Sequence, residues 1–367
     1  MIKKMSKRQF ILLFMMLVAS PVIRGLPLIL AETSKQAAWI TPLVSVLLLF
    51  GLMLVMNEIF KKHQGKNLID ICFSILTKPV GIAIGVIYFI WIMILLGYYL
   101  RLFGEQIVSN IMNEASLHFI IITMLILVGI VLTKSIVYYA RLNEVVFSCF
   151  MLVFISVSLI SLFTKVKIDN LLPISNRDII PILKGSVSGL SVFGYYMFIF
   201  FMFDDVHIQK NNLKLEIKST SALWLLSLTV LVITIGSIGP EAVLKFSDPY
   251  FMITKNVDIL GFLERLDAIL LIMWIMADFT TIAIFTYMNT SLITTIFKIK
   301  RNNSSRIKPN YITYLILIAA YFIAIYGFNS KFMLEWFAKE LFVSCNVIFS
   351  LALPIILFSA GKLRRLI

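Results

Sequence analysis

Charged residues are scarce in this sequence. Of 367 residues, 14% are Asp, Glu, Lys or Arg, while 60% are hydrophobic. An ordinary soluble domain has about 25% charged residues and about 45–50% apolar ones. A soluble chain of this length would lack the polar residues needed to cover its surface. The composition therefore excludes a soluble enzyme, a disordered chain and a secreted disulfide-rich module, and it indicates an integral membrane protein that lies almost wholly in the bilayer.

Cysteine and histidine are also rare, at three residues each. The cysteines, Cys72, Cys149 and Cys345, are far apart and odd in number, so no disulfide framework or metal site is expected. No catalytic residue or cofactor is predicted either. The nearest approach to a catalytic cluster is the stretch with Asp204, Asp205 and His207, for which a solvated loop is the simpler interpretation.

Positive charge exceeds negative charge, with 33 Lys and Arg against 19 Asp and Glu and a formal net charge of +14. In a soluble chain this balance would suggest nucleic acid. Here the basic residues fall in short loops, so we expect no nucleic-acid partner and interpret the charge as a signal of membrane orientation. The two termini and the loops on the same side of the membrane as the N-terminus hold 21 Lys and Arg. The loops on the opposite side hold 10. This bias predicts that both termini face the cytoplasm.

Ten apolar stretches are long enough to cross a bilayer. They cover about 9–31, 37–59, 80–108, 117–133, 143–163, 183–203, 219–239, 266–296, 310–328 and 340–360. The loops are too short for a second domain, so we expect an all-α membrane protein with a single domain over 1–367. The first stretch resembles a signal peptide, but Pro21 and the apolar run that continues to Leu30 favour a retained helix.

Two of the ten stretches contain helix-weakening residues. The first carries Pro21, Gly25 and Pro27, and the sixth has three glycines and three serines over 185–194. Small residues also allow helices to pack closely, which is the alternative reading of the sixth stretch. Two broken helices, each opening a five-helix half, are typical of an inverted-repeat (LeuT-like) transporter fold with halves at about 9–163 and 183–360.

In such folds a small solute binds where the helices are interrupted, near the middle of the membrane. Free N–H groups at Gly25 would suit a carboxylate, and carbonyl groups over 188–191 would suit an ammonium. The segment 240–251 is too short to span the membrane. It is either a cap over this cavity or an ordinary loop.

Ionisable side chains inside the spans form a second signal. Asp278 lies well within the eighth stretch, where a carboxylate is costly, so a functional role is the default hypothesis; the alternative is a protonated Asp bonded to a neighbouring helix. Arg101 and Glu105 are one turn apart and predict an ion pair near the outer end of the third stretch, where snorkelling to the interface accounts for both. Arg24 would meet either Glu105 or an anionic solute, and the sequence leaves this open.

Four short motifs, in the right order, resemble a known family. They are Ser6-Lys7-Arg8-Gln9-Phe10, Gln36-Ala37-Ala38-Trp39-Ile40, Asn170-Leu171-Leu172-Pro173-Ile174 and Glu264-Arg265-Leu266-Asp267-Ala268-Ile269 with Trp274 shortly after. On the basis of these motifs, the chain resembles the B subunit of GerA-type germinant receptors of endospore-forming bacteria. The resemblance covers nearly the whole length of the chain. These subunits form the spore germination permease family, within the amino acid–polyamine–organocation transporter superfamily.

The resemblance implies ten helices in the inverted-repeat fold and a place in the spore inner membrane, beside an A-type membrane subunit and a C-type lipoprotein subunit. It also implies a germinant, often an amino acid, as the ligand. The pocket that it implies is formed by Ser20, Pro21, Val22, Ile23, Arg24, Gly25, Tyr98, Ser188, Gly189, Ser191, Phe193, Gly194, Trp274 and Asp278.

The sequence departs from the superfamily at one position. Members commonly follow the Gly-aromatic pair of the sixth helix with Glu, whereas Gly194-Tyr195 is followed here by Tyr196. This departure puts ion coupling at that position in doubt and fits a receptor at least as well as a pump. The alternative function is an active amino-acid symporter or exchanger with Asp278 as its coupling group.

Overall fold

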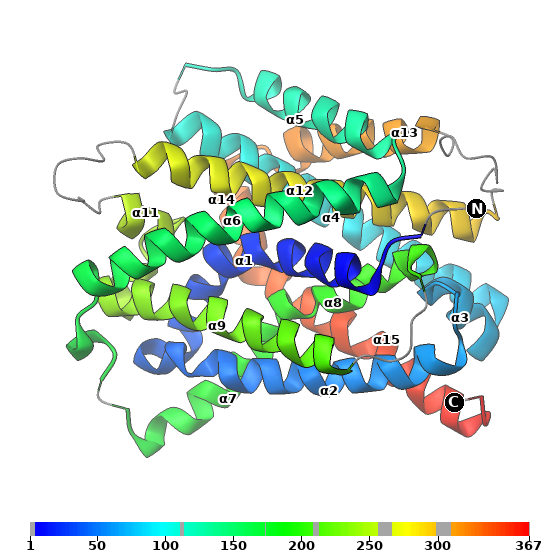
Figure 1. The fold of residues 1–367 in the computed structure, drawn as a ribbon, viewed down its shortest axis with the longest axis horizontal. Coiled ribbons are helices and arrows are strands. Elements are labelled where there is room, and N and C mark those ends of the chain that lie inside the picture. Colours follow the sequence, from blue (N-terminus) through cyan, green and yellow to red (C-terminus); the bar gives the residue numbers. More distant parts are fainter. Residues whose placement is uncertain are drawn as a thin grey trace.

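The computed structural model describes residues 4–110, 114–172, 174–207, 213–255, 266–298 and 310–366. Within these ranges the structure is helical, apart from turns, loops and one isolated parallel bridge between Met5 and Val206. Three motif residues, Pro173, Glu264 and Arg265, lie outside the described residues. Figure 1 shows long helices running side by side in one bundle, with the two ends of the chain at the same end of it.

The helices follow the order of the apolar stretches. In chain order they are α1 (Lys7–Ser34), η1 (Lys35–Trp39), α2 (Thr41–Lys62), α3 (Leu68–Ile75), α4 (Lys78–Asn110), α5 (Leu117–Leu132), α6 (Ile136–Lys165), η2 (Ile168–Asn170), η3 (Asn176–Asp178), α7 (Ile179–Phe193), α8 (Tyr195–Phe198), η4 (Ile199–Asp205), α9 (Leu213–Ile238), α10 (Pro240–Val243), α11 (Pro249–Lys255), α12 (Leu266–Ile296), α13 (Asn310–Phe322), η5 (Ile323–Gly327), α14 (Lys331–Trp336), η6 (Phe337–Phe342) and α15 (Val343–Leu363).

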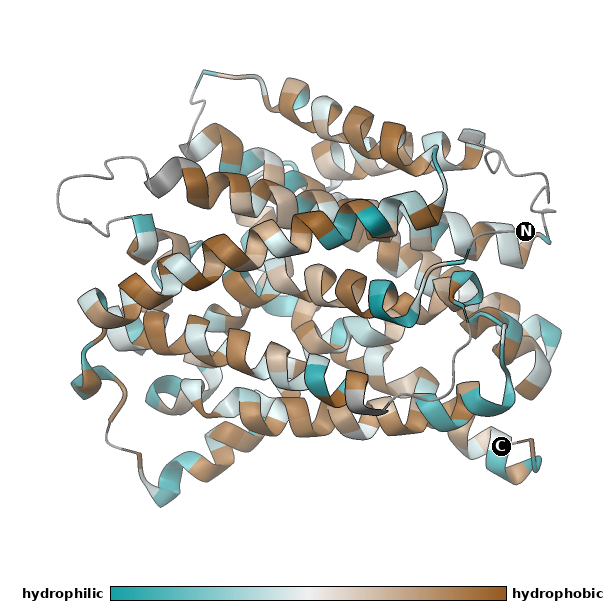
Figure 2. Ribbon diagram, viewed as in Figure 1, coloured by the Kyte–Doolittle hydropathy of each residue, from teal (hydrophilic) through white to brown (hydrophobic). Residues whose placement is uncertain are grey.

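Eight helical stretches in the described part of the chain are long and apolar enough to cross a membrane. The other two predicted spans are shorter apolar helices, Leu117–Leu132 and Tyr311–Gly327. Hydrophobic residues run along the helices, and hydrophilic residues gather mainly towards the two ends of the bundle (Figure 2). The all-helical membrane class is therefore confirmed, with eight full-length spans where ten were predicted.

Helix α1 occupies the centre of the bundle. It begins with a capping box, in which the Ser6 hydroxyl accepts from the Gln9 amide and the Gln9 side chain accepts from the Ser6 amide. It packs against α6, α7, α9 and α12. In its most apolar stretch, 83% of the residues are buried. Because α1 is surrounded by other helices, its side chains can form a site inside the bundle.

The predicted break in the first helix is wrong. Helix α1 is a single helix of 28 residues that contains both Pro21 and Pro27. Each proline removes one backbone hydrogen bond, but neighbouring helices surround α1 and shield the carbonyl groups that are left over. Because the backbone at Gly25 stays helical, it does not present the free N–H cluster expected for a carboxylate.

The interruption in the sixth span lies at one end of the Gly/Ser run. Residues 185–193 are helical, and α7 ends at Phe193 before α8 begins at Tyr195. A Cβ atom at Gly185 would collide with the Ser34 hydroxyl of α1, and one at Gly189 would lie 2.5 Å from the Ser45 hydroxyl of α2. The small residues therefore allow α7 to approach α1 and α2 closely, as the packing alternative predicted.

Candidate functional site

Asp278 of α12 lies in a buried cluster with two residues of α1. Its Oδ1 accepts a hydrogen bond of 2.7 Å from the Ser20 hydroxyl, and its Oδ2 accepts one of 2.8 Å from Arg24 Nη2. Ser20 and Arg24 are four residues apart, so they lie on one face of α1. Asp278 is 1% exposed. A charged carboxylate at this depth requires the partners that α1 supplies.

The Arg24 guanidinium has two further neighbours. Its Nε lies 3.6 Å from Asp248 Oδ1, and its Cζ stands 4.9 Å from the centroid of the Trp274 ring. Asp248 lies immediately before α11, outside the membrane-spanning helices. Burial raises the pKa of Asp248 above its ordinary value, although attraction to Arg24 opposes that rise. We call Ser20, Arg24, Asp248, Trp274 and Asp278 the Arg24 cluster.

Aromatic side chains border the Arg24 cluster. Tyr98 of α4 is buried and lies close enough to Arg24 and Asp248 to interact with their charges. The Phe251 ring lies 4.8 Å from that of Trp274. The Trp274 indole N–H is buried and has no hydrogen-bond partner among the described residues. The cluster thus combines one cation, two carboxylates and an unused donor in an apolar setting.

The structure places the predicted site residues in two groups. Four of them, Ser20, Arg24, Trp274 and Asp278, contact one another, and Tyr98 is nearby. Pro21, Val22 and Ile23 are buried on the same helix. Gly25 is partly buried, and a Cβ atom there would meet nothing within 4 Å, so α1 has open space at this position.

The predicted residues of the sixth span form the second group, which has other partners. The Ser188 hydroxyl donates to the Lys184 carbonyl of its own helix, at 3.4 Å. Phe193 and Ser191 are fully buried, and the Ser191 hydroxyl has no partner among the residues that the structure describes. Gly189 and Gly194 pack on serines of α2 and α15. In the described part of the chain, none of these polar contacts reaches the Arg24 cluster.

The predicted ion pair on α4 is confirmed. Arg101 donates from Nε and Nη2 to Glu105 Oε1, at 2.9 and 2.7 Å. Lys331 Nζ lies 3.9 Å from the other Glu105 oxygen, and Arg101 Nη2 also donates to the Asn329 carbonyl, at 3.4 Å. Glu105 thus pairs with residues near it at this end of α4, and Arg24 pairs with Asp278 and Asp248.

A hydrogen-bonded network follows the interruption at Gly194, and sequence reasoning missed it. The hydroxyl groups of Tyr99 and Tyr195 are 3.0 Å apart, and Asn346 Nδ2 donates to Tyr195 at 3.4 Å. Trp91 Nε1 donates to Asn346 Oδ1 at 2.8 Å. The network joins α4, α8 and α15. Asn346, an isolated Asn in an apolar helix, was the signal in the sequence that could have indicated this network.

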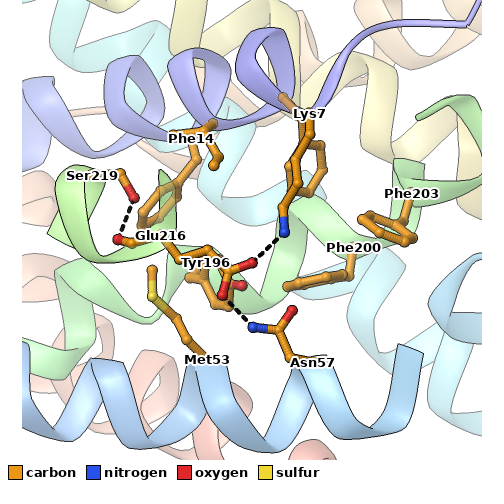
Figure 3. A pocket seen from close by; sticks show the side chains of 11 residues that line it. Lys7, Phe14, Met53, Asn57, Tyr196, Phe200, Phe203, Glu216 and Ser219 are labelled. Atoms are coloured by element: carbon orange, nitrogen blue, oxygen red, sulfur yellow. Dashed lines mark hydrogen bonds and ion pairs between the residues drawn. The ribbon is translucent and has the colours of Figure 1, made fainter. Parts of the chain in front are cut away.

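A second buried cluster, the Lys7 cluster, lies where α1 begins (Figure 3). Lys7 Nζ lies 2.5 Å from Glu216 Oε1 of α9, and Asn57 of α2 donates to Glu216 Oε2. Glu216 is 3% exposed. Tyr196 and Phe200 line a cavity of about 20 Å³ beside these groups, enough for a water molecule. The cluster fastens the first turn of α1 to two neighbouring helices.

The chain before α1 is also bound. The Met5 amide donates to the Asp205 carbonyl at 2.9 Å, and the His207 amide donates to the Met5 carbonyl at 2.7 Å. Tyr287 of α12 donates to the Asp205 carboxylate. The expectation of a solvated loop is therefore wrong at Asp205, because this carboxylate accepts from a helix that also carries Asp278.

Comparisons with known proteins find spore germination proteins. A family model described as spore germination protein matches residues 4–361. The chain is 23% identical over 271 residues to the spore germination protein YndE of Bacillus subtilis (strain 168), which covers 73% of this chain and 74% of that protein. It is 23% identical over 256 residues to YfkT of the same strain, covering 68% of each chain.

Proposed function

Because the chain belongs to the spore germination protein family, we propose that it is the germinant-sensing membrane subunit of a spore germinant receptor. Its ligand is a small solute, an amino acid, and its site is the Arg24 cluster. The observation that carries this proposal is the buried ion pair between Arg24 and Asp278 at the centre of an apolar bundle.

Stability alone gives little reason for such a pair. Removing two charges from water costs several kcal/mol per ion, and a well-packed apolar pair of similar size is often equally stable or more so. An ionisable residue inside a membrane span is therefore a functional hypothesis by default. Here the buried Trp274 N–H, which has no partner among the described residues, supports binding at the same place.

Sensing requires a ligand that binds one conformation better than another. Helix α1 suits this task because it carries Ser20 and Arg24 and packs against four long helices. Its first turn is held by the Lys7 cluster, far along the helix from the site. A ligand that changes the partners of Arg24 changes the contacts of α1, and the helix carries that change to the surface of the bundle.

The proposal includes an arrangement and partners. The helices form two halves, about 9–163 and 183–360, in an inverted repeat of the LeuT type. The subunit lies in the spore inner membrane with both termini on the core side, beside an A-type membrane subunit and a C-type lipoprotein subunit. The resemblance to the B subunits of GerA-type receptors is the ground for this placement, and the common end of the bundle for both chain ends is consistent with it (Figure 1).

Two measurements test the function. Spores without this gene should lose the fall in optical density in response to a subset of the twenty L-amino acids, and the gene restored in trans should recover it. An unchanged response to all twenty would contradict a sensing role. Uptake of the same labelled amino acids by the purified chain in proteoliposomes tests the alternative. Uptake above that of protein-free vesicles would favour a symporter or exchanger.

A further inference from the structure

The two carboxylates of the Arg24 cluster hold the guanidinium unequally. Asp278 accepts a hydrogen bond of 2.8 Å and is fixed on its other oxygen by Ser20. Asp248 stands 3.6 Å from Arg24 Nε, which is beyond hydrogen-bond distance. Arginine has five N–H donors, and the bond to Asp278 uses Nη2. The 3.6 Å separation between Arg24 Nε and Asp248, which we call the gap, is therefore the weakest contact in the cluster.

The same gap is the accessible side of the cluster. The Asp248 side chain is 23% exposed, whereas that of Asp278 is 1% exposed. Asp248 precedes α11, which lies at the end of the bundle opposite the chain termini (Figure 1). A solute that enters from that end meets Asp248 before Arg24, and it meets Asp278 last.

The charges of the gap define the solute. With both carboxylates ionised, the cluster holds one positive and two negative charges. A simple anion would pair with Arg24 but raise the negative excess, and a simple cation would pair with Asp248 and leave the free donors of Arg24 unused. A zwitterion satisfies both groups at no change in net charge. The Trp274 ring lies under the guanidinium, and its buried N–H, which has no partner among the described residues, is a further donor in the cluster.

We propose that a free α-amino acid inserts between Arg24 and Asp248, with its carboxylate on the guanidinium and its ammonium on the Asp248 carboxylate. This inference rests on the proposed function, because it assigns the chemistry of that same site. Charges then alternate from Asp278 through Arg24 and the ligand to Asp248. Without ligand, Asp248 has Arg24 as its charged neighbour; with ligand, it pairs with the ligand ammonium instead. These are the two states that sensing requires. The half-buried Asp248 carboxylate also gains a full positive neighbour.

The test measures binding by the full-length chain in detergent micelles, as the rise of its melting temperature with ligand concentration. The twenty L-amino acids are screened first. For each one that binds, the probes are the amino acid, the amine that lacks its carboxyl group and the acid that lacks its amino group. We expect each analogue to bind at least about tenfold more weakly, because it loses a charge-assisted hydrogen bond. Equal binding of either analogue to the wild-type chain would overturn the inference.

The Asp248→Asn variant makes the assignment specific. It should bind the amino acid about tenfold more weakly, and it should no longer distinguish the amino acid from the acid that lacks the amino group. Asp248→Glu should keep that distinction. The matched control is Asp169→Asn, an exposed carboxylate in another connecting segment, which should bind like the wild type.

The outcomes separate the two proposals. If Asp248→Asn binds the amino acid and still discriminates as the wild type does, the inserted position is wrong while amino-acid sensing stands. If spores without the gene respond normally to all twenty amino acids, the proposed function itself is wrong. If Asp248→Asn does not fold, the inference is decided by comparing the binding of the amino acid and its two analogues to the wild-type chain.

Discussion

Arg24 of α1 donates a hydrogen bond of 2.8 Å to Asp278 of α12, although 254 positions separate the two residues. The pair joins the first membrane helix to α12, in the last third of the chain. It also places a cation between two carboxylates, of which Asp278 is buried and Asp248 is partly exposed. This arrangement is the basis of our proposal that the centre of the bundle recognises a polar solute.

The Arg24–Asp278 pair should show strong coupling in unfolding measurements. Asp278→Asn leaves a buried guanidinium without its main partner and should cost about 3–5 kcal/mol, as for other broken buried pairs. Arg24→Gln should cost a similar amount, and the double variant should cost much less than the two single losses together. Thermal unfolding of the four proteins in one detergent checks this, and additive losses would contradict the pairing.

Gly25→Leu should abolish the response to germinant while leaving the protein folded. A Cβ atom at Gly25 meets nothing within 4 Å, so α1 accepts a side chain at this position, and the added bulk stands one residue from Arg24. Leu also favours a helix over Gly by up to about 1 kcal/mol. Gly51→Leu is the matched control, because Gly51 is exposed on α2 and has the same empty surroundings. Germination assays and membrane protein levels are compared; a normal response in Gly25→Leu refutes the placement.

Gly194→Ala should destabilise the protein. The added methyl group would collide with Ser350 and would lie 2.5 Å from the Leu190 carbonyl oxygen, which belongs to the backbone and cannot turn away. Overpacking of this kind costs about 1–3 kcal/mol. A lower melting temperature than that of Gly25→Ala, where the methyl group has room, is the expected result. Equal stability would show that the interruption tolerates a side chain.

Cys72 should resist thiol reagents in the folded protein. It is fully buried on α3, and burial raises the pKa of its thiol to about 12. The reactive thiolate therefore stays rare, and alkylation of Cys72 should be slow at both pH 7 and pH 9 as long as the protein is folded. Mass spectrometry after treatment with a maleimide, with and without denaturant, measures this, and exposed Cys149 is the internal reference. Rapid labelling of Cys72 before unfolding would contradict the burial of α3.

Much of the fold follows from hydropathy, because a bilayer requires long apolar helices. The eighth predicted stretch, 266–296, coincides with α12. Helix α3 was missed because eight residues are too few to signal a span. The break expected at Pro21 is absent because proline lowers helix stability only locally, whereas packing on all sides of α1 depends on residues far along the chain.

The site was predictable in its parts but not in its pairing. Asp278 and Arg24 stand out because charge is rare inside apolar stretches. Their contact, and that of Arg24 with Asp248, joins α1 to segments more than two hundred residues away, and no local pattern reports such a distance. Asp248 was hidden in a segment that reads equally well as a cap or a loop. The Lys7 cluster escaped notice because Lys7 looks like one of several charges that flank a membrane helix.

The most direct test of the central claim is the dose response of spores that carry Arg24→Gln. The probe is any of the twenty L-amino acids to which wild-type spores respond, and spores carrying Asp169→Asn are the control. Sensing at the Arg24 cluster predicts that half-maximal germination needs at least about tenfold more amino acid in Arg24→Gln, at equal protein level in the membrane. An unchanged dose response would show that the solute is recognised elsewhere.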